Sequence, residues 1–229
     1  MQRRKFTTWV LGLVAGSAIG GPSGAAGPTQ ADTASGIRLA LERGAAAAVS
    51  ELGRNDGFLA NPKVRIPLPG FLADVARVLK FSGQQHRIDD LVTAMNRAAE
   101  AAVPEARTLL VDAVRTMSVD DARRILVGGD DSATRFFAEK TRAPLTTRFL
   151  PIVTRATERV ALADKYNALA GKAAGLGLLG KDEANLQGYV TTKALDGLYT
   201  MIGEEERRIR RDPVGTGSAI LQKVFGSAR

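Results

Sequence analysis

Apolar residues recur at intervals of three and four along most of this chain, the spacing typical of α-helices that bury one face. The longest such run extends from Ile88 to Met117. It stays in phase across Pro104, which predicts one kinked helix or two nearly coaxial helices. The run consists of Ile88, Val92, Met95, Ala99, Ala102, Ala106, Leu110, Ala113 and Met117.

Capping and breaking residues divide the rest of the chain into further helices. Ser118 precedes acidic residues as an N-cap, Pro144 is expected in a first helical turn, and Pro213 is expected to end the last long helix. The fold class predicted is therefore all-α, a multi-helix bundle of unequal helices in one domain. The helices are predicted over residues 36–52, 70–81, 119–127, 130–143, 144–174 and 182–211, with a short closing helix over 216–226.

One stretch, RNDGFLANPKVRIPLPG at residues 54–70, departs from this helical pattern. Its prolines preset extended or turn geometry. Val64, Ile66 and Leu68 alternate with Lys63 and Arg65, so one side can lie on helices while the other faces water. We expect a stiff extended strap between the first two helices of the mature chain, covering the helices that carry Met95 and Leu198.

Residues 1–31 have the composition of an export signal rather than of a folded element. Arg3, Arg4 and Lys5 precede an apolar run that is too short for a permanent membrane anchor, and small residues follow. The paired arginines before Lys5 and Phe6 are typical of twin-arginine export, although ordinary secretion is the alternative. Cleavage is expected after Ala25, Ala26 or Ala31. Residues 32–229 are then the mature domain, which is expected in the periplasm and without a transmembrane segment.

Composition narrows the chemistry that is available. The chain has no cysteine and one histidine, which excludes thiolate and multi-histidine metal sites, and we expect no metal and no cofactor. Without Arg3, Arg4 and Lys5, the 32 basic residues become 29 against 24 acidic ones, a net charge of +5. These cations are scattered among acids with few aromatic residues nearby, so nucleic acid is not expected as a partner.

Five ordered segments carry a resemblance to a known family: DGFLANPKVRIPLPG, MNRAAEAA, VDDARRIL, ATRFF and EEERRIRRDPVGTGSAILQKVFG. Together they resemble a bacterial family of exported helical proteins catalogued as a domain of unknown function. The similarity covers residues 36–226. It implies an exported all-α domain, and it brings no established activity, substrate or catalytic residue.

Asn96 and Glu100 lie one helical turn apart on the flank of the apolar run. An amide and a carboxylate at the edge of a groove could hold a polar ligand, with Arg97 or Arg107 supplying charge. Alternatively, they could hydrogen-bond the backbone of a neighbouring loop, for which the strap is the obvious candidate.

Glu205 lies in the same row as Leu198 and Ile202, so it should be buried and either paired with an arginine or protonated. Its neighbours Glu204 and Glu206 have arginines four residues later. We expect these to form a solvated helix end.

Other polar motifs have simpler explanations. The glycine-rich GLGLLGKD stretch lacks the strand and the hydroxyl residue of a phosphate loop and is expected to end a helix, with Asp182 capping the next one. The pairs Asp89–Asp90, Asp120–Asp121 and Asp130–Asp131 lie at predicted helix starts and lack calcium-loop spacing. His86 is expected at the surface.

Two functional hypotheses follow. The first is a non-catalytic binding or interaction module whose groove lies beside the strap, near Asn61 and Lys63, and whose partner is a protein or small ligand in the periplasm. The second is a carboxylate-dependent hydrolytic enzyme that uses Glu100 or Glu205 with a nearby arginine.

Overall fold

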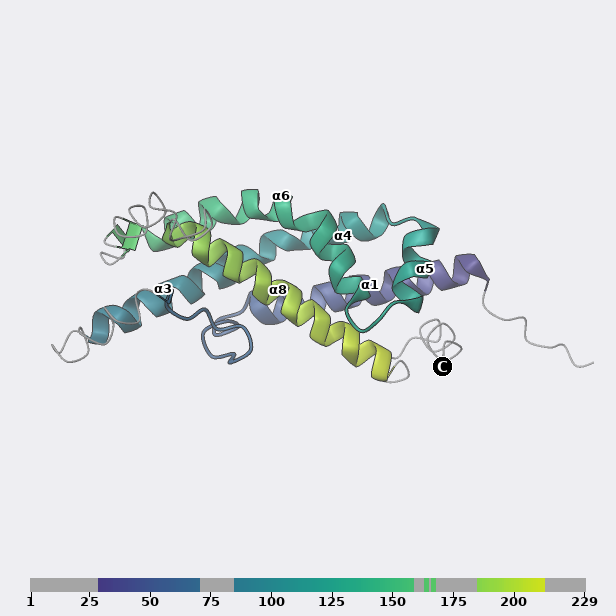
Figure 1. The fold of residues 1–229 in the computed structure, drawn as a ribbon, viewed down its shortest axis with the longest axis horizontal. Helices are drawn as coiled ribbons and strands as arrows, with labels where there is room; N and C mark the ends of the chain where they lie inside the picture. The colour runs from purple at the N-terminus through teal and green to yellow at the C-terminus, as the bar shows by residue number, and fades with distance from the viewer. Residues whose placement is uncertain (1–28, 71–84, 159–162, 165, 168–184, 213–229) are drawn as a thin grey trace, which may run out of the picture.

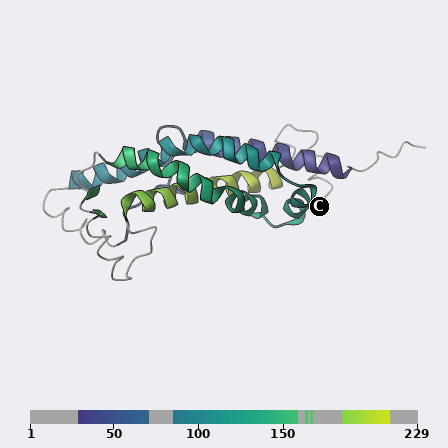
Figure 2. The same cartoon turned by 90° about the horizontal axis from the view of Figure 1, so that it is seen from above.

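The computed structural model describes residues 29–70, 85–158, 163–164, 166–167 and 185–212, and in these residues it is an all-α bundle (Figure 1). Its long helices run along the long axis of the molecule, as the view turned by 90° also shows (Figure 2). No helix among the described residues is both long and apolar enough to cross a membrane. The all-α prediction is confirmed.

The kinked element predicted across Pro104 is present. It consists of α3 (Gln85–Ala102), the 3₁₀ turn η1 (Val103–Glu105) and α4 (Ala106–Arg115). Pro104 lies in the first turn of η1, where its missing N–H leaves no helical hydrogen bond unmade. The predicted apolar run is buried along its whole length except for Val92, which is half-buried.

The helix α6 (Ser132–Thr157) is continuous, so the prediction of a separate element starting at Pro144 is wrong. Pro144 and Pro151 are both exposed inside it. Because they face solvent, water can satisfy the carbonyl groups one turn earlier that lose a helical partner. The apolar side of the helix stays packed, and its buried row steps by four.

The sequence periodicity predicts a buried row of Leu145, Phe149, Ile152, Ala156, Val160 and Ala163. The observed row differs from this prediction after Phe149. It consists of Leu145, Phe149, Val153 and Thr157, whereas Ile152 is half-buried and Ala156 is exposed. Ala163 is buried as expected, and Val160 lies outside the described residues.

The last long helix, α8 (Leu186–Arg211), buries the apolar row that its three- and four-residue spacing predicts. Its N-cap is Asn185, whose side chain accepts a hydrogen bond from the Gly188 N–H at 2.7 Å. Asp182, the predicted cap, lies outside the described residues. The helix packs against α6 and α1 (Gln30–Leu52), and α6 packs in turn against α3. The buried row consists of Leu186, Val190, Ala194, Leu198, Ile202 and Ile209.

The long helix α1 and the short helix α5 complete the bundle. α1 ends at Leu52 as predicted but begins six residues before the predicted start at Gly36. Ser118 is the N-cap of α5 (Val119–Val127), as predicted, and the structure adds that Ser118 and Asp121 cap each other reciprocally. The predicted helix over 70–81, the glycine-rich stretch at 175–182 and the closing helix over 216–226 lie outside the described residues, apart from Gly70.

Candidate functional site

The strap (residues 54–70) runs from the end of α1 over α3 and α8, as predicted. Val64 and Ile66 point into the core, while Lys63 and Arg65 are exposed. The strap approaches α8 closely at Gly197, where an added Cβ atom would lie 2.6 Å from Cε1 of the buried Phe58. The glycine therefore makes room for the strap.

Glu100 holds the first part of the strap from beneath. Its Oε1 atom accepts hydrogen bonds from the backbone N–H groups of Phe58 and Leu59, at 3.0 and 3.1 Å. Its Oε2 atom forms an ion pair with Arg97 at 2.6 Å. Both oxygens of this buried carboxylate are thus engaged by the protein itself.

Arg97 continues this network to the surface. Its Nη2 atom lies 2.7 Å from a carboxylate oxygen of Asp56, a strap residue in the left-handed region with φ of 65°. The hydrogen bonds to Glu100 and Asp56 raise the pKa of Arg97 above its ordinary value. A residue other than glycine rarely adopts this conformation, and the ion pair helps to hold it.

Asn96 holds the extended part of the strap. Its Oδ1 accepts from the Ile66 N–H at 2.8 Å, and its Nδ2 donates to the Ile66 carbonyl at 3.0 Å and to the Val92 carbonyl at 2.8 Å. One amide thereby satisfies both backbone groups of Ile66, as a neighbouring strand would. The Tyr189 hydroxyl donates to the Pro67 carbonyl at 3.1 Å. Asn96 and Glu100 therefore make the loop-backbone hydrogen bonds of the second interpretation above.

A polar hollow of about 500 Å³, here called the strap hollow, lies on the other side of the strap. Asn61 and Lys63 line it, whereas Asn96, Arg97, Glu100 and Glu205 do not. The full lining is Glu51, Arg54, Asn55, Asp56, Gly57, Ala60, Asn61, Pro62, Lys63 and Met201.

Several polar contacts order the rim of the strap hollow. The Lys63 ammonium pairs with Glu204 of α8 at 2.8 Å, and Glu204 also accepts from Arg207 at 2.8 Å. These two cations, Lys63 foremost, lower the pKa of Glu204. Asn61 accepts from the Lys63 N–H at 3.1 Å. Arg54 is exposed at the same rim, and its guanidinium makes no hydrogen bond or ion pair within the described residues.

Glu205 lies elsewhere, in the buried row of α8 as predicted. It forms an ion pair with the exposed Arg208, and its Cβ faces α1, 3.5 Å from where a Cβ on Gly44 would lie. The arginine partner that its burial required is therefore present. The expected pairing of Glu204 with Arg208 is wrong, because Lys63 and Arg207 bind Glu204 instead.

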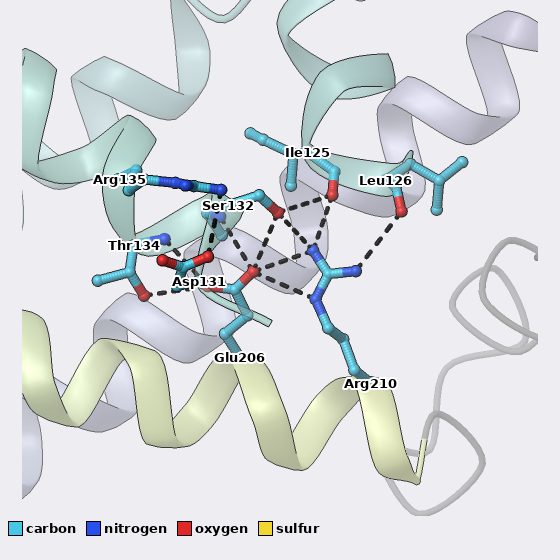
Figure 3. Close-up of polar contacts among 9 residues, drawn as sticks. Ile125, Leu126, Asp131, Ser132, Thr134, Arg135, Glu206 and Arg210 are labelled. Carbon is cyan, nitrogen blue, oxygen red and sulfur yellow. Dashed lines mark hydrogen bonds and ion pairs between the residues drawn. The ribbon is translucent and has the colours of Figure 1, made fainter. Parts of the chain in front are cut away.

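Glu206 and Arg210 form a second buried network that the sequence did not reveal (Figure 3). Glu206 is only 7% exposed, so the prediction of a solvated helix end is wrong here. Its oxygens accept from the N–H groups of Ala133 and Thr134, both at 3.0 Å, which caps the start of α6. Asp131, at the N-cap position of that helix, makes no capping hydrogen bond through its side chain.

Arg210 completes this network. It donates to Glu206 at 2.9 Å, to the Ser132 hydroxyl at 2.7 Å and to the Ile125 carbonyl at the end of α5, also at 2.7 Å (Figure 3). The pair was visible in the sequence only as an acid and an arginine four residues apart. Nothing in that local spacing indicates that both lie against two other helices.

In the part of the chain that the structure describes, no three histidine, aspartate or glutamate side chains come together to hold a metal ion. The exposed position of His86 agrees with its predicted surface placement. Polar side chains border open space at the strap hollow, which offers hydrogen bonding and charge to a ligand.

Comparison with known proteins identifies the family. The model of the family described as "Protein of unknown function (DUF4197)" matches residues 27–226, and the chain belongs to this family. No curated protein and no solved structure matches the chain. The family resemblance derived from the sequence segments is therefore confirmed.

Proposed function

We propose that this protein is an exported, non-catalytic binding module whose partner or ligand occupies the strap hollow. The observation that carries the proposal is the division of labour across the strap. Its inner side is bound to α3 and α8 by Glu100, Asn96 and Tyr189, whereas its outer polar side chains border an open hollow of about 500 Å³. A rim that is already ordered loses little conformational entropy when a ligand binds.

The rim chemistry favours a polar ligand that carries an acidic group. Arg54 offers an exposed guanidinium that makes no hydrogen bond or ion pair among the described residues. Asn55 and Asn61 add amide groups, and Met201 adds an adaptable apolar contact. A carboxylate or a phosphate can take both of the parallel N–H donors of a guanidinium, which gives direction as well as affinity.

Crosslinking in cells tests this proposal. A photoreactive amino acid at Asn61 or Lys63 should capture one defined partner, and an Arg54→Glu substitution should remove that product. Lys140 is the matched control, because its side chain is 49% exposed against 56% for Lys63 and it lies on α6, away from the strap hollow. Equal capture from Lys140, or no capture from either strap position, would refute the proposal.

Export through the twin-arginine route is part of the same proposal. The family match begins at residue 27 and α1 begins at Gln30, so cleavage after Ala25 or Ala26 leaves both whole. Cleavage after Ala31 would remove the first two residues of α1. An Arg3→Lys/Arg4→Lys variant should stay unprocessed in the cytoplasm. If it is still exported and cleaved, ordinary secretion is the route.

The competing hypothesis assigns hydrolytic chemistry to Glu100 or Glu205. It predicts that Glu100→Gln or Glu205→Gln abolishes a cellular phenotype while the melting temperature stays nearly unchanged. The contacts support the binding proposal, since each carboxylate is engaged by an arginine and Glu100 also accepts two backbone N–H groups. A substitution at Glu100 should therefore lower the melting temperature.

A further inference from the structure

An apolar groove of about 310 Å³ lies between α5 and the N-terminal part of α1, whereas the strap follows the C-terminal end of α1. The groove places two large exposed apolar side chains at the surface: Val127 is 78% exposed and Val119 is 45% exposed. Exposed apolar surface next to a groove is typical of a surface that another segment covers. The lining consists of Thr33, Ala34, Val119, Ala122, Arg123, Leu126 and Val127.

The end of α8 lies beside this groove. Arg210, in the last turn of α8, donates to the Ile125 carbonyl at 2.7 Å and contacts the Leu126 carbonyl at 3.5 Å. Leu126 itself lines the groove. The last turn of α8 therefore lies within the reach of one arginine side chain from Leu126, a residue of the groove.

Enough chain follows α8 to cover the groove. Seventeen residues, 213–229, come after Asp212. The nine residues of α5 are about 14 Å long, whereas 17 residues can span up to about 56 Å when fully extended. Length therefore allows the segment to reach any part of the groove, including in a compact conformation.

The sequence of this segment has the matching character. Ile220, Leu221, Val224 and Phe225 have the spacing of one apolar helix face, and the segment contains no acidic residue. The family match continues to residue 226, so these residues belong to the same domain as the bundle. An apolar face of this kind needs a surface on which it can be buried.

We propose that residues 213–229 of the same chain dock in the groove between α1 and α5, with the apolar face around Leu221 and Phe225 against Val119, Leu126 and Val127. The docked segment closes this end of the bundle and removes the exposed valines from water. Docking at this place leaves the strap hollow open. This inference does not depend on the function proposed for the strap hollow.

The absence of cysteine makes a direct test possible, because any thiol in a variant is an introduced one. Val127→Cys should be combined in the full chain with Ile220→Cys, Leu221→Cys, Val224→Cys or Phe225→Cys, one at a time. Under mild oxidation, at least one pair should form an intramolecular disulfide, which needs Cα atoms about 4.4–6.8 Å apart. Leu150→Cys, at an exposed apolar position on α6, should not pair with any of the four.

A second measurement uses single thiols and alkylation rates. The Val127→Cys thiol should react about tenfold faster when Leu221→Asp and Phe225→Asp release the segment, as expected if docking is favoured about tenfold. Gln222→Asp, on the polar side of the same segment, should leave the rate unchanged. A Leu150→Cys thiol should react equally fast in all these backgrounds.

Each alternative outcome is distinct. Disulfides that form only between two molecules would show that a second copy covers the groove, and they would overturn the proposal. No disulfide together with an unchanged alkylation rate would also overturn it. If Leu150→Cys accelerates as well, the aspartates unfold the bundle, and the disulfide pattern then decides.

Discussion

The networks around Glu100 and Glu206 are built alike but hold different parts of the molecule. In each, a buried carboxylate accepts hydrogen bonds from two successive backbone N–H groups: Phe58 and Leu59 for Glu100, and Ala133 and Thr134 for Glu206. In each, an arginine on the same helix neutralises the carboxylate. The two networks differ in what else the arginine contacts.

The Arg210 side chain extends into the core, whereas the Arg97 side chain extends to the surface. The Arg210 side chain is 15% exposed and binds the Ile125 carbonyl of α5, so Glu206 and Arg210 join α8, α6 and α5. The Arg97 side chain is 36% exposed and reaches Asp56 at the surface. The same donor and acceptor set therefore assembles core helices in one place and positions a surface strap in the other.

We expect the largest loss of stability when the buried network of Glu206 and Arg210 is broken. Glu206→Gln should lower the free energy of unfolding by about 3–5 kcal/mol, because it leaves the largely buried Arg210 without its counter-charge. Urea denaturation measures this loss. Glu204→Gln, at a half-buried position on the same helix whose carboxylate pairs with Lys63 at the surface, is the control and should change stability little. If Glu206→Gln lowers stability no more than Glu204→Gln does, Glu206 does not hold α8, α6 and α5 together as inferred.

Breaking the network of Glu100 and Arg97 should lower the free energy of unfolding by less, and its effect should be confined to the strap. Glu100→Gln should lower the free energy of unfolding by about 1.5–3 kcal/mol, the range for hydrogen bonds to a charged group. Hydrogen exchange should accelerate at the Phe58 and Leu59 amides, while the amides of α6 keep their protection. If exchange accelerates equally in α6, the Glu100 network does not act on the strap alone, and the distinction between the two networks is contradicted.

The close approach of the strap at Gly197 sharpens the comparison further. Gly197→Ala places a Cβ atom 2.6 Å from Phe58, so the strap must shift, and we expect a loss of about 1–3 kcal/mol. Gly44→Ala is the matched control, because its nearest contact would be an ordinary 3.5 Å and alanine favours a helix. Thermal denaturation should show a lower melting temperature for the first variant and an equal or higher one for the second.

The smallest effect concerns the rim of the strap hollow. The lowered pKa of Glu204 means that its ion pair with Lys63 is fully present above the ordinary glutamate pKa and is lost as the pH falls through the lowered value. Acidification should therefore loosen the strap near Lys63 before the bundle unfolds. A titration of the Lys63 amide by NMR should show a midpoint below the ordinary glutamate value, and Glu204→Gln should abolish that transition. A midpoint at or above the ordinary value would contradict the pairing.

Much of the strap could be predicted from the sequence because its signals are local. The alternation of Val64 and Ile66 with Lys63 and Arg65 decides which side is buried, and the prolines exclude a helix. The position of Asn96 and Glu100 on the flank of an apolar run likewise suggested a loop partner. The choice between loop and ligand required the structure, since an amide binds either equally well.

The errors concern properties that no local pattern contains. A proline inside a helix is disruptive when the carbonyl group that loses its partner is buried. α6 continues through Pro144 and Pro151 because both prolines face water. Glu206 and Arg210 have the spacing of a surface pair, but the N–H groups that Glu206 caps lie more than 70 residues earlier in the chain. Burial of a charge depends on which helix end arrives beside it.

Local signals were sufficient to predict the helical fold, the course of the strap, the family and the N-cap of α5, because periodicity, proline geometry and N-cap hydrogen bonds act within a few residues. Which acidic residues hold distant parts of the chain together depends on the packing of the helices. Glu100 and Glu206 became buried when distant backbone N–H groups were packed against them. Only the tertiary structure decided that Asn61 and Lys63 border open space while Asn96 and Glu100 lie beneath the strap, because one face of an ordered loop can contact the core only if the other faces solvent.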